Sequence, residues 1–325
     1  MLIKKVISPP PSTEWREVFR SDASATPFQS PEWMTAIEQT GRYSNASRLY
    51  QTAGGRIIVP LALRASVLGH RSASSMPHGF GAGGCISDYP IGKEDILTLL
   101  EDLEDLKVRK LSIRPNPVQI DLWPEEQIGW SASSRVSHVI DLTGGYEKVW
   151  QERFRGTKRN RIRKARKAGM RIDKGNDTDL LEKYFSIYLR WSEARARRRK
   201  LPPQLIRFLA VRREPKWKFE NVAKTMGSRL QIYIASIDET PVAGTVFLNM
   251  GKSAVYWRGA SDPDLLSRFP GNDLLQNEMI FDACQAGCSA YHMGESGGVD
   301  SLMRFKSDFG AVAIPYAEFH RNSQH

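Results

Sequence analysis

The chain has 325 residues, of which 41% are hydrophobic and 26% charged, and its formal net charge is +11. This composition is typical of a folded globular protein and excludes a disordered or low-complexity chain. No apolar stretch approaches the length that crosses a bilayer, so we expect no membrane span and a cytoplasmic protein. The excess of positive charge favours a phosphorylated, anionic partner.

Cysteine and histidine spacing indicates no metal site. Cys85, Cys284 and Cys288 fit neither a disulfide framework nor a zinc pattern, and the six histidines are scattered. We therefore predict that the protein binds no metal.

The first half of the chain alternates short helices and strands. Ser30 is a suitable N-cap for a helix with Pro31 in its first position, and Gly41 ends this helix. The other predicted elements are a helix over 12–20, β-type runs over 46–52 and 56–63, a glycine-rich loop over 77–85, a helix over 93–106, and strands over 108–114 and 136–142. We place a domain boundary after residue 143, which gives an N-terminal domain 1–143 and a C-terminal domain 144–325.

A strongly basic segment follows this boundary. Residues 153–171 contain ten Lys or Arg and no Asp or Glu. Ile162, Ala165 and Ala168 recur at helical spacing, and Gly169 is suited to end the helix. We predict a basic helix over 153–168 that docks by a thin apolar stripe and presents its charges to a polyanion. The alternative is a solvated charged face.

The rest of the second half has a clear order of elements. We predict a helix that begins after the N-cap Asp177 and ends in the basic cluster 195–200. The later elements are a helix over 204–212, three antiparallel strands over 229–237, 241–249 and 253–259, a helix over 272–286, a strand over 290–293, a loop over 294–298, a short helix over 301–308 and a last strand over 312–319. The first half has a less regular version of the same order, which indicates an internal duplication.

Five motifs in this order carry a resemblance to a known family. They are Phe28-Gln-Ser-Pro-Glu-Trp33, Arg159-Asn-Arg-Ile-Arg-Lys-Ala-Arg-Lys-Ala-Gly169, Val242-Ala-Gly-Thr-Val-Phe247, Tyr256-Trp-Arg-Gly-Ala-Ser261 and Arg304-Phe-Lys-Ser-Asp-Phe-Gly310. Together they resemble the FemABX-type aminoacyl transferases and their BioF2-like acyltransferase relatives, over nearly the full chain. The resemblance implies an α/β fold of two tandem GNAT-like domains, each with a mixed, mostly antiparallel sheet flanked by helices.

The resemblance also implies a reaction. FemX-related members take an amino acid from aminoacyl-tRNA and join it to an amine, in a cell-wall or another biosynthetic pathway. We therefore expect a transferase that forms an amide bond between a tRNA-borne amino acid and a small-molecule or peptide amine, with no bound cofactor and no DNA partner. The residues expected to contact the tRNA are Arg155, Lys158, Arg159, Arg163, Lys164 and Lys167.

Attack of an amine on an ester needs orientation, removal of a proton and stabilisation of an oxyanion. By its match to the family's Phe-Lys pair, Lys306 is the expected cation near the ester, with Phe305 beside it. Glu295, on a glycine-flanked loop, could accept the amine proton, bind the ammonium group or form a turn. Tyr256 and Arg258 alternate on one strand, so we expect them on one face lining the substrate site. Arg304 would bind phosphate or carboxylate, or be solvated.

The competing co-substrate is an acyl-CoA, which would make the protein an acyl-CoA-dependent N-acyltransferase. GNAT enzymes hold its pyrophosphate on a glycine-containing loop at a helix N-terminus. The corresponding stretch here, Arg268-Phe-Pro-Gly-Asn-Asp273, carries a carboxylate where a small residue is expected. A third possibility is a non-catalytic RNA-binding protein, which would have no use for Lys306.

Overall fold

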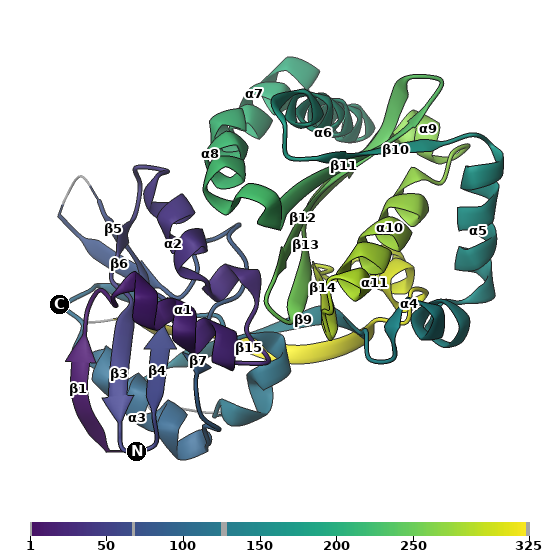
Figure 1. Cartoon of the computed structure of the whole chain (residues 1–325). Coiled ribbons are helices and arrows are strands. Elements are labelled where there is room, and N and C mark those ends of the chain that lie inside the picture. Colours follow the sequence, from purple (N-terminus) through teal and green to yellow (C-terminus); the bar gives the residue numbers. More distant parts are fainter. Residues whose placement is uncertain (1, 67–68, 125–128, 323–325) are drawn as a thin grey trace.

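Two long strands, β9 (Ser131–Asp141) and β15 (Val312–Asn322), connect the two lobes of the computed structural model (Figure 1). The structure describes residues 2–66, 69–124 and 129–322. β9 pairs antiparallel with β15 and also with β14 (Ala290–Glu295) of the C-terminal lobe, while the far end of β15 pairs with β8 (Lys110–Ile113) of the N-terminal lobe. A sheet of eleven strands within these described ranges therefore runs from one lobe into the other. In this sheet, strands from both sides of residue 143 lie next to one another. The domain boundary after residue 143 stays a prediction.

The N-terminal lobe adds a second, four-stranded sheet of order β1-β3-β4-β7 among the residues described. Its strands are β1 (Ile3–Ile7), β3 (Arg48–Thr52), β4 (Arg56–Val59) and β7 (Ile86–Ser87). The other elements of the lobe are α1 (Ser12–Ser21), the 3-10 turns η1 (Pro27–Gln29) and η2 (Pro117–Leu122), α2 (Pro31–Glu38), β2 (Ser44–Asn45), β5 (Ala62–Ala65), β6 (Arg71–Ser74) and α3 (Lys93–Glu104).

The strand predicted over 56–63 is divided in two. β4 ends at Val59 in the four-stranded sheet, and β5 begins at Ala62 in the long one. Pro60 lies between them, and its lack of an N–H interrupts the ladder and lets the chain change sheets.

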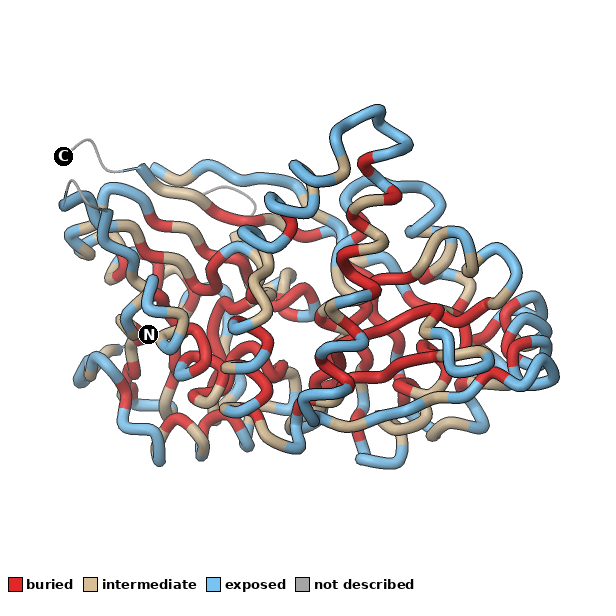
Figure 2. The backbone as a smooth tube through the Cα atoms, turned by 90° about the horizontal axis from the view of Figure 1, so that it is seen from above, coloured by how far each residue is buried: buried red, intermediate tan, exposed pale blue. Residues whose placement is uncertain are grey.

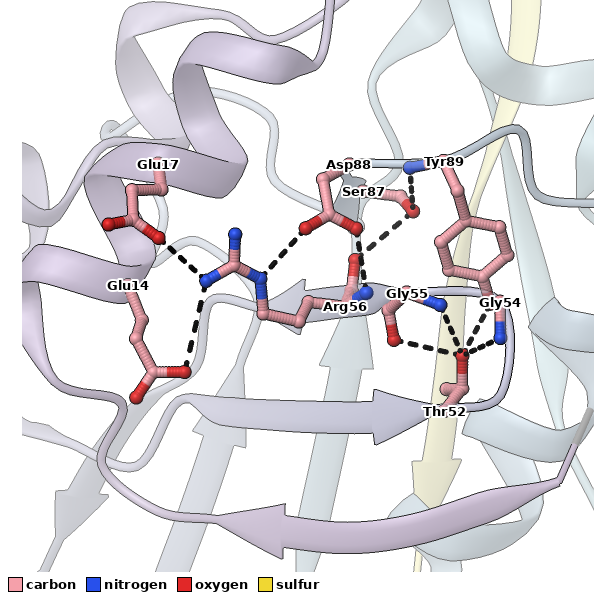
Figure 3. Close-up of polar contacts among 9 residues, drawn as sticks. All are labelled: Glu14, Glu17, Thr52, Gly54, Gly55, Arg56, Ser87, Asp88 and Tyr89. Carbon is pink, nitrogen blue, oxygen red and sulfur yellow. Dashed lines mark hydrogen bonds and ion pairs between the residues drawn. The ribbon is translucent and has the colours of Figure 1, made fainter.

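A charged network joins the four-stranded sheet to α1 (Figure 3). Arg56 donates from Nε to Asp88 at 2.8 Å and from Nη1 to Glu17 at 2.7 Å, and Nη1 also lies 4.0 Å from Glu14. In the adjacent hairpin turn, the Thr52 hydroxyl accepts from two successive backbone amides at 3.1 Å each. Each acidic group has a structural partner in this network, so it supports the fold.

The C-terminal lobe opens with α4 (Gly145–Lys148), a π-helical turn η3 (Val149–Arg153) and the basic helix α5 (Gly156–Lys167). It continues with β10 (Arg171–Gly175), α6 (Thr178–Arg198), α7 (Pro203–Arg213), α8 (Lys216–Met226), the turn η4 (Gly227–Arg229), β11 (Leu230–Ile237), β12 (Thr240–Met250), β13 (Ser253–Ser261), α9 (Pro263–Leu266), α10 (Gly271–Gln285), β14, α11 (Asp300–Ser307) and β15. The fold class is confirmed as α/β, with mostly antiparallel sheets flanked by helices.

Alternate residues of β11 and β12 face opposite helical layers. Ile232 and Val246 pack in the cluster that contains α6 and α8, whereas Tyr233 and Phe247 pack in the cluster that contains α5 and α10. This is the period-two pattern of a strand buried on both faces. Figure 2 shows the resulting continuous buried strands within each lobe.

Two predicted helices begin at other residues than expected, and one helix was not predicted. The basic helix α5 begins at Gly156 rather than at residue 153, because the preceding residues form the π-helical turn. α10 begins at Gly271 with Pro270 in the N-cap position, so Asn272 lies inside its first turn. The sequence prediction missed α8, although Phe219, Val222, Ala223 and Met226 are buried at helical spacing.

Candidate active site

A cavity of about 480 Å³ lies between the two lobes. The N-terminal lobe supplies Phe28, Arg114, Pro117 and the loop 78–82 to its wall. The C-terminal lobe supplies residues of α6, α8, β13 and β14, including Tyr184, Tyr188, Lys218, Trp257, Arg258 and His292. A cavity of this size, with aromatic walls and a few charged groups, is suited to a small molecule or to the end of a peptide.

The first motif of the sequence holds the glycine-rich loop against this cavity. Gln29 donates to the carbonyls of Gly83 at 2.8 Å and Cys85 at 3.0 Å, and the Trp33 indole donates to Phe80 O at 3.0 Å. Gly81 has a φ of +94°, and a Cβ there would lie 2.2 Å from the Phe28 ring. The predicted glycine-rich loop is thus a packed wall of the cavity.

Arg258 connects the lobes from the opposite wall. Its Nη2 donates to Gly79 O at 2.5 Å and lies 3.0 Å from Glu214, which also pairs with Lys218 at 2.7 Å. Burial opposes ionisation of Glu214, but the charges of Arg258 and Lys218 hold its pKa below the ordinary value. Burial lowers the pKa of Lys218 despite the Glu214 carboxylate. One carboxylate between two cations leaves this wall with a net positive charge.

The prediction that Tyr256 and Arg258 share one face is wrong, because the pairing of β12 with β13 contains a bulge. Phe247 lies opposite Tyr256 and Val246 lies opposite Arg258, so Trp257 is the extra residue and the two predicted side chains face opposite layers. Both nevertheless line the cavity between the lobes.

A second cavity of about 210 Å³ lies on the α10 side of the sheet. Among the described residues, the parallel pairing of β13 with β14 covers Ser253 to Val255 and ends there. Just beyond this point, Tyr256 and Met293 line both cavities. Two ligands that approach from opposite faces of the sheet would therefore meet at these two side chains.

Lys306 lies at the smaller cavity, which Phe305 also lines. Lys306 is only 2% exposed, and its ammonium group donates to the carbonyls of Gly294 at 2.7 Å and Glu295 at 2.8 Å. Burial lowers its pKa to about 8, while the Glu295 carboxylate acts in the opposite direction. Lys306 thus fixes the end of β14 and holds a cation next to the junction of the cavities.

Glu295 lies at the rim of the larger cavity, where Arg135 and Tyr316 hold it. Its carboxylate is 3.0 Å from Arg135 Nη1 and accepts from the Tyr316 hydroxyl at 2.5 Å. Arg135 also pairs with Glu318 at 2.5 Å, and the pKa of Glu318 is lowered by Arg114 and Arg135 against the effect of burial. Glu295 is therefore a positioned carboxylate and not a simple turn residue.

Arg304 is exposed on α11 and does not line either cavity. Sequence reasoning also passed over His292, which lines the larger cavity from β14 and is 5% exposed. Burial lowers the pKa of His292 to about 4, and its Nε2 has no hydrogen-bond partner. Its place two residues before Gly294, where a strand leads into a glycine loop, was the available signal. Among the described residues, no group of three or more His, Cys, Asp or Glu is arranged to hold a metal ion.

The predicted tRNA-contact residues on α5 and at its N-cap divide into two sets. Arg155, Arg163, Lys164 and Lys167 are exposed. Arg159 instead donates to three carbonyls of the preceding turn, at Trp150, Gln151 and Phe154, over 2.7 to 3.0 Å. Lys158 is 5% exposed, pairs with Asp273 at 2.8 Å and lies 4.0 Å from the centre of the Phe305 ring. Arg159 and Lys158 thus have structural contacts that the charge pattern alone did not indicate.

Asp273 occupies the first turn of α10, where a negative charge favours the helix dipole. It is 1% exposed, and its second oxygen pairs with Arg161 at 3.0 Å. The N-terminus of α10 therefore carries its own buried carboxylate, which two cations from α5 neutralise.

The comparisons with known proteins agree with this fold. Residues 152–307 match the acetyltransferase (GNAT) domain family. No curated protein sequence matches the chain. FemX is similar in structure over 98% of this chain and 97% of its own, with a TM-score of 0.70 and 12% identity.

Two further structures extend the likeness over whole chains. L-PGS from Bacillus licheniformis has a TM-score of 0.52 and 10% identity, over 98% of this chain and 94% of its own. A tandem GNAT protein from the clavulanic acid biosynthesis pathway has a TM-score of 0.51 and 12% identity, over 98% of each chain. The whole chain thus has a FemX-like fold, and residues 152–307 are similar to the acetyltransferase (GNAT) domain, as the resemblance of the motifs implied.

Proposed function

We propose that the protein transfers an amino acid from aminoacyl-tRNA to an acceptor amine. The amine nitrogen attacks the ester carbonyl carbon, an amide bond forms, the ester C–O bond breaks, and the tRNA hydroxyl leaves with a proton while the amine loses one. The family to which the motifs point uses this donor, and the FemX-like fold supports the same choice.

The observation that carries the proposal is Asp273 at the N-terminus of α10. This is where a GNAT acetyltransferase would hold the CoA pyrophosphate on free backbone amides. Here a buried carboxylate, 2.8 Å from Lys158 and 3.0 Å from Arg161, already occupies the positive end of the helix. A pyrophosphate would have to displace this charge, so the site favours a donor without one.

The geometry of α5 suits a tRNA acceptor arm. Lys158 anchors the inner side of the helix above Phe305, and Phe305 lines the smaller cavity. The exposed cations Arg163, Lys164 and Lys167 lie on the same helix and can neutralise neighbouring phosphates without reading sequence. A terminal ester held there would enter the smaller cavity beside Lys306.

The acceptor would then occupy the larger cavity. In this arrangement Lys306 stabilises negative charge on the ester oxygen, and Phe305 packs beside it. Glu295 accepts the amine proton or binds the ammonium group, while Tyr256 and Arg258 position the acceptor. The aminoacyl-tRNA donor implies reaction in the cytoplasm.

Acyl-CoA is the second candidate donor, because the matched family is one of acetyltransferases. A purely RNA-binding role is disfavoured by Lys306, since RNA binding does not require a buried lysine in the wall of the smaller cavity. Incubation of candidate amines with a mixture of charged tRNAs, with and without RNase, beside parallel reactions with acyl-CoA, separates the possibilities. Product that RNase abolishes supports the proposal, and CoA-dependent product that resists RNase overturns it.

A further inference from the structure

A second basic surface lies at the end of α6 and on α7, and we call it the α6–α7 tip. Residues 195–213 contain eight Lys or Arg and no Asp or Glu. Arg195, Arg197, Arg198, Arg199 and Lys200 are all exposed. Figure 1 shows α7 on the far side of α6 from the sheet, away from α5. The transfer reaction assigns no role to this surface.

The α6–α7 tip also exposes large apolar side chains. Leu205, Phe208 and Leu209 are spaced at i, i+3 and i+4 on α7 and are 51%, 60% and 46% exposed. Leu201 and Val211 are exposed beside them. Apolar groups of this size on one helix face mark an interaction surface rather than a solvated one.

The basic helix α5 differs from the α6–α7 tip in its exposed apolar side chains. On α5, the apolar residues Ile162 and Ala165 are fully buried, and none of the large exposed apolar side chains belongs to that helix. Phosphate groups of RNA need only cations, so α5 has what an RNA backbone requires. Exposed Leu and Phe among arginines match instead a bilayer interface, where apolar side chains enter the acyl region and cations meet anionic headgroups.

A groove of about 260 Å³ connects the tip to the active site. Arg195, Arg199, Leu201 and Leu209 line it, together with Trp191 and Arg213. Trp191 and Arg213 also line the larger cavity between the lobes. A molecule held at an interface under the tip would therefore lie at the entrance of the proposed acceptor site.

We propose that the α6–α7 tip docks the protein peripherally on an anionic phospholipid surface, with Leu205 and Phe208 inserted and the arginines on the headgroups. No helix in the described part of the chain is long and apolar enough to cross a membrane. The docking is therefore a surface contact of one exposed helix face. It does not depend on the identity of the acyl donor.

Flotation of the full chain with vesicles tests the proposal. We expect binding to vesicles of phosphatidylcholine with about one third phosphatidylglycerol, little binding to phosphatidylcholine alone, and weaker binding at high salt. The double variant Leu205→Ser/Phe208→Ser should lower binding about tenfold or more, because it removes the inserted groups. Charge reversal by Arg198→Glu/Arg199→Glu should have a similar effect.

Matched control variants separate the tip from general charge and hydrophobicity. Val312→Ser removes a side chain that is 64% exposed on β15, and Arg163→Glu/Lys164→Glu reverses two charges on α5. Both should bind vesicles as the unaltered protein does, and circular dichroism should report the same fold for all variants.

Two outcomes would overturn the proposal: no vesicle binding by the unaltered protein, or binding that the Leu205→Ser/Phe208→Ser variant retains in full. If vesicle binding is absent and Arg198→Glu/Arg199→Glu loses tRNA binding, the tip is an RNA surface instead. Because no transfer is measured, failure here leaves the proposed reaction untouched, and failure of the reaction leaves this result untouched.

Discussion

The buried ion pair between Lys158 and Asp273 leads us to a prediction about the free energy of unfolding. The charge pattern of the sequence alone would not give this prediction. Asp273→Asn keeps the size of the side chain but removes the counter-charge of Lys158, whose ammonium is 2.8 Å away and 5% exposed. Removal of one partner of a buried pair costs about 3–5 kcal/mol, because the other charge is left without compensation. We expect a loss of about 3 kcal/mol, near the lower limit of that range, because the amide oxygen can still accept a hydrogen bond.

The converse variant should cost less. In Lys158→Met, Asp273 keeps its 3.0 Å pair with Arg161 and its favourable place at the N-terminus of α10, so we expect a loss of about 1–2 kcal/mol. Urea unfolding followed by circular dichroism measures both values, and tRNA binding by Lys158→Met should equal that of the unaltered protein. An Asp273→Asn variant that unfolds like the unaltered protein, or a Lys158→Met variant that loses tRNA affinity, would refute the structural role of this pair.

Three further predictions concern the reaction and its pH dependence. Lys306→Met should lower the rate of transfer about a hundredfold, as removal of an electrostatic contact to the oxyanion does, with tRNA affinity unchanged in a filter-binding assay. Burial lowers the pKa of Lys306 from 10.5 to about 8, so between these pH values the unfolded chain binds more protons than the folded protein. The free energy of unfolding of the unaltered protein, relative to that of Lys306→Met, should therefore rise by roughly 3 kcal/mol from pH 7.5 to 10.5. Urea unfolding at both pH values measures this difference, and a difference that stays constant would contradict the prediction. Arg163→Glu/Lys167→Glu should weaken tRNA binding about tenfold at low salt, and equal affinity would remove α5 from the RNA surface.

Local signals predicted much of the fold. Ser30 accepts a hydrogen bond from the Trp33 amide, and Asp177 accepts one from the Leu180 amide, so both N-caps act as the sequence indicated. Each depends on residues within one helical turn. The α/β class and most of the order of the C-terminal elements, α8 excepted, follow from such local patterns.

The missed features depend on contacts between distant residues. Lys158 meets Asp273 across 115 positions, so a sequence that shows only a basic run cannot tell its buried cation from its exposed ones. The bulge at Trp257 reverses the face of Arg258, and a single extra residue in a ladder has no signature in hydrophobic alternation. The partners of Glu295 come from β9 and β15, far away in the chain.

The proposed transfer of an amino acid from tRNA to an amine takes place at the cavity junction beside Lys306. Its most direct test is a reaction with tRNA that carries a radiolabelled amino acid, followed by mild alkali, which hydrolyses the ester but leaves an amide. We predict label in an alkali-stable product only when the protein, intact charged tRNA and an acceptor amine are all present, and strongly reduced label with Lys306→Met. Full alkali release of the label at every acceptor tested, with stable product formed from acyl-CoA instead, would contradict the account.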